Sequence, residues 1–306
     1  MSEVIVNHIT KTYNKGATLA VDDVSFSVEK GELFGLIGPD GAGKTSIFRM
    51  LTTLLLPDRG SASVNGFDIV KDYKNIRKNV GYMPGKFSLY QDLTVEENLN
   101  FFATVFNTSI KENYELIKDI YIQIEPFKTR RAGKLSGGMK QKLALCCALI
   151  HRPTVLFLDE PTTGVDTVSR KEFWEMLQRL KDQGITILVS TPYMDEATLC
   201  ERIALIQEGK LMSIDTPAKI ISSYPKKLYA IKSHQMIDLL TDLRQMSNIA
   251  TCNTFGEFHH ISFFGPDDIE AAKTLTQQLQ LGGKHNDLEL KIIAPTIEDC
   301  FIQLMT

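Results

Sequence analysis

Hydrophobic and polar positions divide the chain into segments of different texture. Continuous apolar runs, typical of strands buried on both faces, occur at residues 32–38, 154–160 and 185–190. Strand signals vanish between residues 93 and 150, where apolar positions recur with helical spacing at 95–106, 114–124 and 137–150. The pattern predicts an α/β domain with a helical subdomain inserted at about residues 86–150.

The texture changes after residue 222. Strands are predicted at residues 228–231, 249–254, 259–264 and 288–293, helices at 236–246 and 267–280, and a last helix at 296–305. The β-α-β-β-α-β order is typical of a small ferredoxin-like α+β domain. We therefore predict a large domain at residues 1–222 and an accessory domain at residues 227–306.

The first apolar run leads into a glycine-rich loop. GPDGAGKTS, residues 38–46, fits the pattern GxxxxGK[ST] and precedes a helix predicted to begin near Gly43. Glycines allow backbone N–H groups to surround a polyphosphate, Lys44 would reach its β- and γ-phosphates, and Thr45 would bind Mg²⁺. A chance glycine-rich turn is disfavoured by the strand and helix on either side. The candidate ATP-binding residues are Gly38, Asp40, Gly41, Ala42, Gly43, Lys44, Thr45 and Ser46.

The second apolar run ends in two acids, within VLFLDEP at residues 155–161. Burying carboxylates is costly unless a cation meets them, and Mg²⁺ would serve. Asp159 is therefore predicted to join Thr45 at the metal, and Glu160 to polarise the attacking water. Glu160 and Lys44 are the candidate catalytic residues.

Composition narrows the functional classes. Hydrophobic residues make up 43% of the 306 residues, and the formal net charge of −3 argues against a nucleic-acid binder that neutralises phosphates. No apolar run approaches the roughly 20 residues that span a bilayer, and the first residues lack a signal-peptide pattern, so no direct membrane insertion is expected. Five cysteines without a CxxC pair suit a reducing cytosol, and Cys146 and Cys147 are predicted to be buried on a helix.

The segment KLSGGMKQKLALCCALIHRP, residues 134–153, resembles the signature motif of the ABC ATPases. LSGG is intact, and Met139 replaces the glutamine of the longer LSGGQ form. With the phosphate loop and the DE strand, the resemblance covers about residues 4–221. It implies a P-loop NTPase head with a mixed-sheet core, bound ATP and Mg²⁺, and hydrolysis of ATP to ADP and phosphate.

The resemblance also implies further site residues. Ser136, Gly137 and Gly138 would contact ATP held by a second head, whereas for the segment alone Ser136 is an ordinary helix cap. Tyr13 resembles the aromatic residue that stacks on adenine, with a packing role as the alternative. Asp166 resembles the loop acid that couples the two sites of a dimer.

Two segments resemble drug-export ABC ATPases that pair with a separate integral-membrane permease. They are SLYQDLTVEENLNFFA, residues 88–103, and APTIEDCFIQLM, residues 294–305, although TIED is also a plain helix start capped by Thr296. The resemblance implies a cytoplasmic subunit held at the inner face of the membrane by its permease. Phe87, Leu89 and Tyr90 are either docking anchors or core residues.

Two positions depart from the family pattern. Gly85 stands where a glutamine contacts Mg²⁺ and senses the permease, and Pro192 stands where a histidine bonds the γ-phosphate. His151 is expected to cap a helix C-terminus rather than to replace that histidine. Either the site turns ATP over slowly, or this chain pairs with a non-identical head whose site its LSGG completes. The second explanation is favoured, because a subgroup of exporter ATPases resembles this chain in having MPG and a residue other than histidine at these positions in one half. Retained Glu160 argues against it, and a homodimer stays possible.

Two other functions stay open at this stage. One is a soluble ABC protein acting on ribosomes or DNA, which usually has two heads in one chain. The other is a regulatory head that binds ATP with little hydrolysis. A regulatory or dimer-stabilising role is predicted for residues 227–306. The transported substrate cannot be read from this chain, because selectivity lies in the permease.

Overall fold

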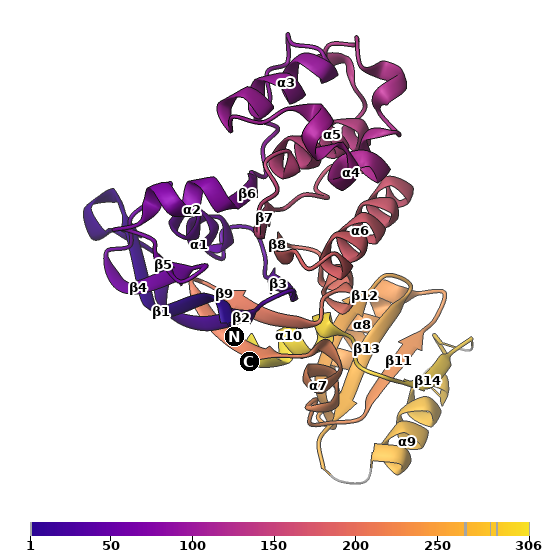
Figure 1. Ribbon diagram of the computed structural model, residues 1–306. Helices are drawn as coiled ribbons and strands as arrows, with labels where there is room; N and C mark the ends of the chain where they lie inside the picture. The colour runs from indigo at the N-terminus through magenta and orange to yellow at the C-terminus, as the bar shows by residue number, and fades with distance from the viewer. Residues whose placement is uncertain (1, 266–267, 282, 286, 306) are drawn as a thin grey trace. The chain divides into compact units, whose positions relative to one another are not determined.

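The computed structural model describes residues 2–265, 268–281, 283–285 and 287–305. The chain divides into two compact units, Met1–Pro217 and Ala218–Thr306 (Figure 1). Within the described residues, no helix has the length and apolar character needed to cross a membrane.

The first unit is built on a mixed six-stranded sheet with the order β10-β9-β3-β8-β7-β6. Its inner strands run parallel, and β10 pairs antiparallel with β9 at one edge. All residues of β3, β7 and β8 are buried, which confirms the three strands predicted from continuous apolar runs. The strands are β3 Leu33–Ile37, β6 Val80–Met83, β7 Val155–Asp159, β8 Thr186–Thr191, β9 Arg202–Gln207 and β10 Lys210–Asp215.

A second, antiparallel sheet was not predicted from the sequence. Its order is β2-β1-β4-β5, formed by β1 Ser2–Tyr13, β2 Thr18–Glu29, β4 Arg59–Val64 and β5 Phe67–Asp68, with a 3-10 turn at Asn14–Gly16. Buried residues of both sheets, of α1 Lys44–Leu51 and of α2 Tyr73–Asn79 form one core. Phe48 of α1 meets Phe157 of β7 edge to face at 5.7 Å, so the core holds the phosphate-loop helix against the central strand.

Three helices form the inserted subdomain, and they gather at one end of the first unit (Figure 1). They are α3 Val95–Val105, α4 Ile110–Tyr121 and α5 Gly137–Leu149, with 3-10 turns at Glu125–Phe127 and Ala132–Lys134. The second helix begins at Ile110 rather than at residue 114, because Ser109 and Glu112 form a capping box. Cys146 and Cys147 are buried and free on α5, as predicted. The unit is completed by α6 Thr167–Asp182 and the 3-10 helix η4 Met194–Leu199.

The second unit has the predicted order of elements. They are β11 Leu228–Lys232, α8 Met236–Gln245, β12 Ile249–Phe255, β13 Phe258–Phe263, α9 Asp268–Leu281 and β14 Glu289–Ile293, between α7 Pro217–Ser222 and α10 Ile297–Met305. The sheet order is β12-β13-β11-β14, with antiparallel pairs throughout. This order matches the ferredoxin-like arrangement. Residue 267, predicted to start α9, lies outside the described residues.

The TIED segment starts α10 through a hydrogen-bonded cap. The Asp299 carboxylate accepts from the backbone N–H and the hydroxyl of Thr296, at 2.8 and 2.7 Å, and Thr296 Oγ1 accepts from the Asp299 N–H. The other Asp299 oxygen lies 2.8 Å from His260 Nδ1 on β13, and both side chains are buried. Thr296 is therefore the predicted helix cap, and Asp299 also fastens α10 to the sheet.

Candidate nucleotide-binding site

The phosphate loop joins the end of β3 to the start of α1. The Gly38 N–H donates to the Thr191 carbonyl at 3.2 Å, which fixes the loop to the neighbouring strand β8. Asp40 and Gly41 form its exposed crest. The Lys44 side chain is buried and donates to the carbonyls of Gly38 and Pro39 at 2.7 and 2.9 Å. The ammonium group is therefore held beneath the loop.

Gly43 has a backbone that only glycine adopts readily. Its φ of +102° lies in the left-handed half of conformational space, and a Cβ there would lie 2.3 Å from the Ala20 carbonyl oxygen. The turn directs the loop into α1, whose first N–H groups have no partner within the helix. The loop thus ends at a helix N-terminus, where partial positive charge favours an anion.

The acids at the end of β7 face the phosphate loop. Asp159 Oδ1 accepts from Thr45 Oγ1 at 3.1 Å and from Ser190 Oγ at 2.6 Å. Glu160 Oε1 lies 3.1 Å from Lys44 Nζ. Glu160 has a φ of +50°, and its N–H donates to the carbonyl and hydroxyl oxygens of Ser190 at 3.0 and 3.1 Å. These bonds hold the strained residue in place.

The residues at this centre fit ATP and Mg²⁺. A hydroxyl and a carboxylate oxygen, from Thr45 and Asp159, are the hard ligands that Mg²⁺ prefers, and Mg²⁺ takes its other ligands from water and phosphate. Lys44 has three donors, which here contact carbonyl oxygens and Glu160, and a phosphate would offer stronger charge-assisted acceptors. The arrangement can therefore hold a nucleoside triphosphate with its metal.

Tyr13, from the antiparallel sheet, contacts the phosphate loop. It ends β1, is half-buried, and its hydroxyl lies 3.0 Å from Ser46 Oγ at the start of α1. The structure thus brings Tyr13 to the phosphate loop, where both a packing role and an adenine contact stay open. Ala42 is buried in the loop, and its carbonyl accepts from the Gly209 N–H at 3.1 Å.

The signature residues lie beside the loop of Asp166. Ser136 caps α5 by accepting from the Met139 N–H at 3.3 Å, and Asp166 caps α6 by accepting from the Ser169 N–H at 3.0 Å. This backbone bond lowers the pKa of Asp166. A Cβ on Gly138 would lie 2.8 Å from Ser169 Oγ. The two helix starts therefore touch each other, and Ser136 makes no hydrogen bond to the phosphate loop among the described residues.

Of the two departures from the family pattern, Gly85 lies against the acids, and Pro192 follows β8, the strand that pairs with β7. A Cβ on Gly85 would lie 3.0 Å from the Asp159 carbonyl oxygen and 3.7 Å from Glu160 Cβ, so the loop backbone occupies space beside the DE pair. Pro192 directly follows β8, next to Thr191, whose carbonyl accepts from Gly38. Neither residue offers a side-chain hydrogen bond at its position. The backbone frame is thus intact where two polar side chains are replaced.

Sequence reasoning missed two residues that order this frame. Ser190 bonds Asp159 and Glu160, and the buried Glu196 accepts from Thr191 Oγ1 at 2.5 Å. The parallel pairing of Asp159 with Ser190 places the first of them. Adjacent parallel strands with polar carboxyl ends were the available signal, because such ends meet at one edge of a sheet.

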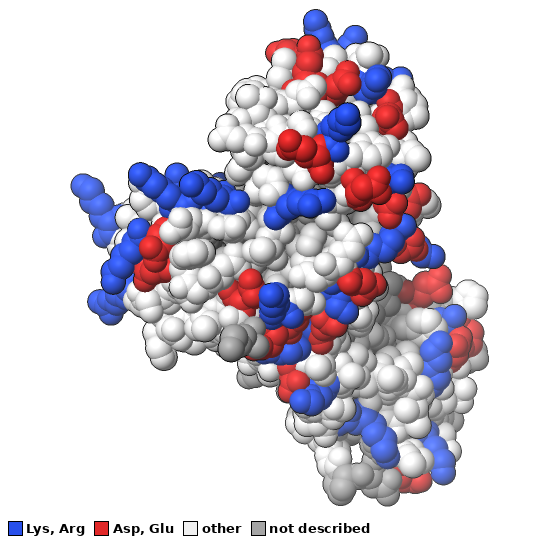
Figure 2. All heavy atoms as spheres, viewed as in Figure 1, with Lys and Arg blue, Asp and Glu red and all other residues white. Residues whose placement is uncertain are grey.

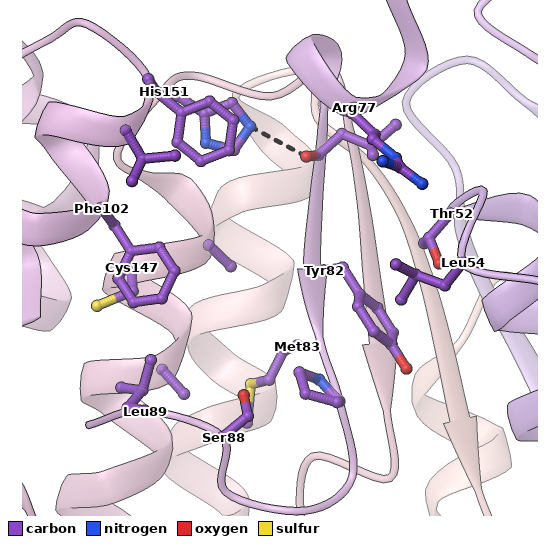
Figure 3. A pocket seen from close by; sticks show the side chains of 16 residues that line it. Thr52, Leu54, Arg77, Tyr82, Met83, Ser88, Leu89, Phe102, Cys147 and His151 are labelled. Atoms are coloured by element: carbon purple, nitrogen blue, oxygen red, sulfur yellow. Dashed lines mark hydrogen bonds between the residues drawn. The ribbon is translucent and has the colours of Figure 1, made fainter. Parts of the chain in front are cut away.

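An apolar cavity of about 420 Å³ lies between β6, its following loop and the helical subdomain (Figure 3). Met83, Leu89 and Phe102 are among its walls, and Leu54 and Arg77 stand at its rim on the sheet side. All of these residues belong to the first unit. Leu89 is buried, whereas 51% of Tyr90 is exposed, so the predicted anchors Leu89 and Tyr90 differ in access.

His151 lines this cavity, and the expectation that it caps a helix C-terminus is wrong. Its Nε2 donates to the Val80 carbonyl at 3.0 Å (Figure 3). Its ring stacks on that of Phe106 with 3.8 Å between centroids. The ring reaches a carbonyl of β6 because α5 packs beside that strand. Burial lowers the pKa of His151 below its ordinary value.

The lowered pKa makes stability depend on pH. The unfolded chain protonates His151 near pH 6.5 while the folded ring resists protonation, so stability falls as pH decreases through about 6.5. We expect the advantage of the wild type over His151→Gln in free energy of unfolding to shrink between about pH 7.5 and about pH 5.5. Urea unfolding of both proteins measures this, since other titrating groups cancel. A constant difference between them contradicts the assignment.

Comparison with known proteins agrees with this geometry. Residues 21–163 match the protein family described as ABC transporter. The chain is 36% identical over 310 residues to the "Probable multidrug ABC transporter ATP-binding protein YbhF" of Escherichia coli (strain K12), which covers 99% of this chain and 52% of that protein. It is 32% identical over 311 residues to the "Nod factor export ATP-binding protein I" of Rhizobium sp. (strain N33). That alignment covers 99% of this chain and 98% of the relative.

A solved structure described as an ATP binding subunit of an ABC transporter has a TM-score of 0.66 and 27% identity, over 73% of this chain and 93% of that chain. The chain therefore belongs to the ABC transporter family, with the fold of its ATP-binding domain. Relatives of this chain include ATP-binding proteins of multidrug and export type. The chain spans about half the length of the Escherichia coli relative.

Proposed function

We propose that this protein is the ATP-binding and ATP-hydrolysing subunit that powers export by a separate membrane permease. Residues 1–222 act as the ATPase head, with the helical subdomain at about 86–150, and residues 227–306 act as an accessory domain. Relatives described as multidrug or Nod factor export proteins support the direction of transport. The permease would hold the chain at the cytoplasmic face of the membrane.

The observation that carries the proposal is the convergence of Lys44, Thr45, Asp159 and Glu160. Thr45 Oγ1 lies 3.1 Å from Asp159 Oδ1, and Lys44 Nζ lies 3.1 Å from Glu160 Oε1. The two segments that meet here are more than a hundred residues apart in the sequence. Bound Mg-ATP supplies the phosphoryl group whose transfer to water releases energy. Lys44 binds and orients the phosphates, Asp159 and Thr45 hold the metal, and Glu160 orients the water and accepts its proton.

The apolar cavity is the proposed docking site for the permease. It borders Pro84, which precedes Gly85, and the next residues of the loop lead to Leu89 in its wall. A cytoplasmic segment of the permease seated there would contact both the helical subdomain and the loop that touches Asp159. Movement at the acids would thereby reach the permease. The centre of the Phe87 ring, in the same loop, lies 5.5 Å from Lys140 Nζ on α5.

Gly85 and Pro192 favour slow hydrolysis in the chain's own site and a dimer with a non-identical head. One missing hydrogen-bonding group typically reduces the rate about 10²–10³-fold, and losses within one site need not add. Ser136, Gly137 and Gly138 lie at a helix start, and within the described part of the chain none of them hydrogen-bonds its own phosphate loop, which suits a contact in trans. A head that binds ATP with little hydrolysis is the second candidate, favoured by the same two residues.

Phosphate release tests the proposal. It is measured for the chain alone, for the chain with a co-expressed permease and second head, and for the same mixtures with Ser136→Arg, which blocks the signature. We expect slow release alone, faster release by the complex, and loss of the complex's activity with Ser136→Arg while the chain's own Mg-ATP affinity is unchanged. No saturable Mg-ATP binding would overturn the proposal, and undiminished activity with Ser136→Arg would overturn the trans contact.

A further inference from the structure

Exposed basic side chains crowd α2 and the turn before it. Four of the eight residues from 71 to 78 are Lys71, Lys74, Arg77 and Lys78, and all four are exposed. Figure 2 shows lysine and arginine side chains gathered over the region labelled α2 in Figure 1. None of the three lysines is part of an ion pair within the described ranges of the chain. Their charge is therefore available to a partner.

Exposed apolar side chains accompany these cations. The exposed fractions are 58% for Leu54, 59% for Leu56, 47% for Val70 and 40% for Tyr73. Arg77 donates to the hydroxyl and carbonyl oxygens of Thr53 at 2.8 Å each, which brings the segment after α1 beside α2. Its guanidinium also lies 5.2 Å from the centre of the Tyr73 ring. These contacts place basic and apolar groups side by side. We call this region the α2 surface, and it consists of Leu54, Leu56, Val70, Lys71, Tyr73, Lys74, Arg77 and Lys78.

The acids nearest to the lysines are engaged by the backbone. Asp68 Oδ1 accepts from the N–H groups of Val70 and Lys71 at 2.9 Å each, and these bonds lower the pKa of Asp68. Asp72 Oδ2 accepts from the Asp68 N–H at 3.1 Å. Both carboxylates therefore stabilise the turn that starts α2. The four exposed cations lie beside two acids that already accept hydrogen bonds from backbone N–H groups.

We propose that the α2 surface contacts the headgroups of anionic lipids at the membrane. Exposed leucine, valine and tyrosine beside lysine and arginine are the combination that partitions to a bilayer interface, where cations meet anionic headgroups and apolar side chains enter the acyl boundary. A polynucleotide would use the cations and could stack a base on Tyr73, but it would leave the exposed leucines and Val70 without a role. The whole chain has a net charge of −3, so the four basic side chains of the α2 surface form a local positive patch on an acidic protein.

The place of the α2 surface suits this role. Leu54 and Arg77 also line the rim of the apolar cavity, so the surface continues directly from the proposed permease-docking site. A permease bound at the cavity would orient this chain with its α2 surface toward the bilayer. This orientation rests on the proposed function. Lipid contact would then steady the head beside the permease without any segment crossing the membrane.

Vesicle co-sedimentation of the full chain tests the inference. We expect binding to phosphatidylcholine vesicles that contain phosphatidylglycerol, little binding to phosphatidylcholine alone, and loss of binding at high salt. The triple variant Lys71→Gln, Lys74→Gln, Lys78→Gln should bind about 100-fold more weakly, since each lysine near an anionic surface contributes about five-fold. Leu54→Ser with Leu56→Ser should weaken binding about ten-fold, because it removes apolar contact only.

A matched control removes the same charge elsewhere. Lys111→Gln, Lys118→Gln, Lys128→Gln changes three exposed lysines of the helical subdomain and should bind vesicles as the wild type does. Equal loss in this control, or equal binding to neutral and anionic vesicles, would overturn the inference. Tighter binding to RNA than to vesicles, unaffected by the leucine changes, would assign the surface to nucleic acid instead. Mg-ATP binding shows that each variant is folded, and phosphate release tests the proposed function separately.

Discussion

Replacing Glu160 with glutamine is expected to reduce phosphate release about 10²–10³-fold while Mg-ATP binding is retained. Glu160 Oε1 lies 3.1 Å from Lys44 Nζ, beside the loop that would hold the phosphates. Glutamine keeps the shape and an oxygen for Lys44, but its amide cannot accept the proton of an attacking water. The measurement compares phosphate release and nucleotide titration for both proteins without a partner head, so that only this chain's own site contributes.

Glu172→Gln is the matched control for this change. Glu172 pairs with Lys142 at 2.7 Å on α6, is 47% exposed, and lies outside the nucleotide site. The control should release phosphate at the wild-type rate, because a surface ion pair contributes little. Retention of more than half of the wild-type activity in Glu160→Gln would show that Glu160 is not the base. Another group would then accept the proton of the attacking water.

Gly43→Ala should abolish measurable Mg-ATP binding at concentrations that saturate the wild type. Alanine at a φ of +102° is strained, and its Cβ would lie 2.3 Å from the Ala20 carbonyl oxygen, which belongs to β2 and cannot move freely. Left-handed strain and overpacking together cost roughly 2–5 kcal/mol. The loop would relieve this by rotating its N–H groups away from the phosphates.

Gly41→Ala separates the two causes. Gly41 has a φ of +80°, but a Cβ there would have open space around it, so only the conformational cost of about 1–2 kcal/mol applies. Titration with a fluorescent ATP analogue should show weakened binding for Gly41→Ala and none for Gly43→Ala. Equal affinities in the two variants would show that contact with Ala20 does not shape the loop. Thermal unfolding of each variant reports whether the fold is kept.

Local patterns in the sequence predicted much of the fold. The buried strands β3, β7 and β8 were visible because strands covered on both faces are apolar at every position. The order of elements in the second unit was visible because each strand and helix has its own period. The antiparallel sheet β2-β1-β4-β5 was missed because its strands are covered unevenly, with no single period along their length.

The candidate site could be predicted only in part, because its motifs are local but their meeting is not. Nine consecutive residues identify the phosphate loop, and a strand ending in Asp159 and Glu160 identifies the acids. Their contact depends on the parallel register of β7, β8 and β3, which no short segment encodes. Ser190 enters the site through that register alone. His151 was assigned to a helix end because the sequence cannot show that β6 lies beside α5.

By itself, the sequence determined which chemistry the chain can perform. Glycines, a lysine, hydroxyls and two carboxylates at set spacings are the groups expected to bind a polyphosphate and a metal ion, because short motifs are enough to supply them. Only the tertiary structure decided how Gly85 lies against Asp159, that His151 belongs to an apolar cavity, and that basic and apolar residues from two segments form the α2 surface. Such contacts join positions distant in the chain, and packing of the shared core places them together.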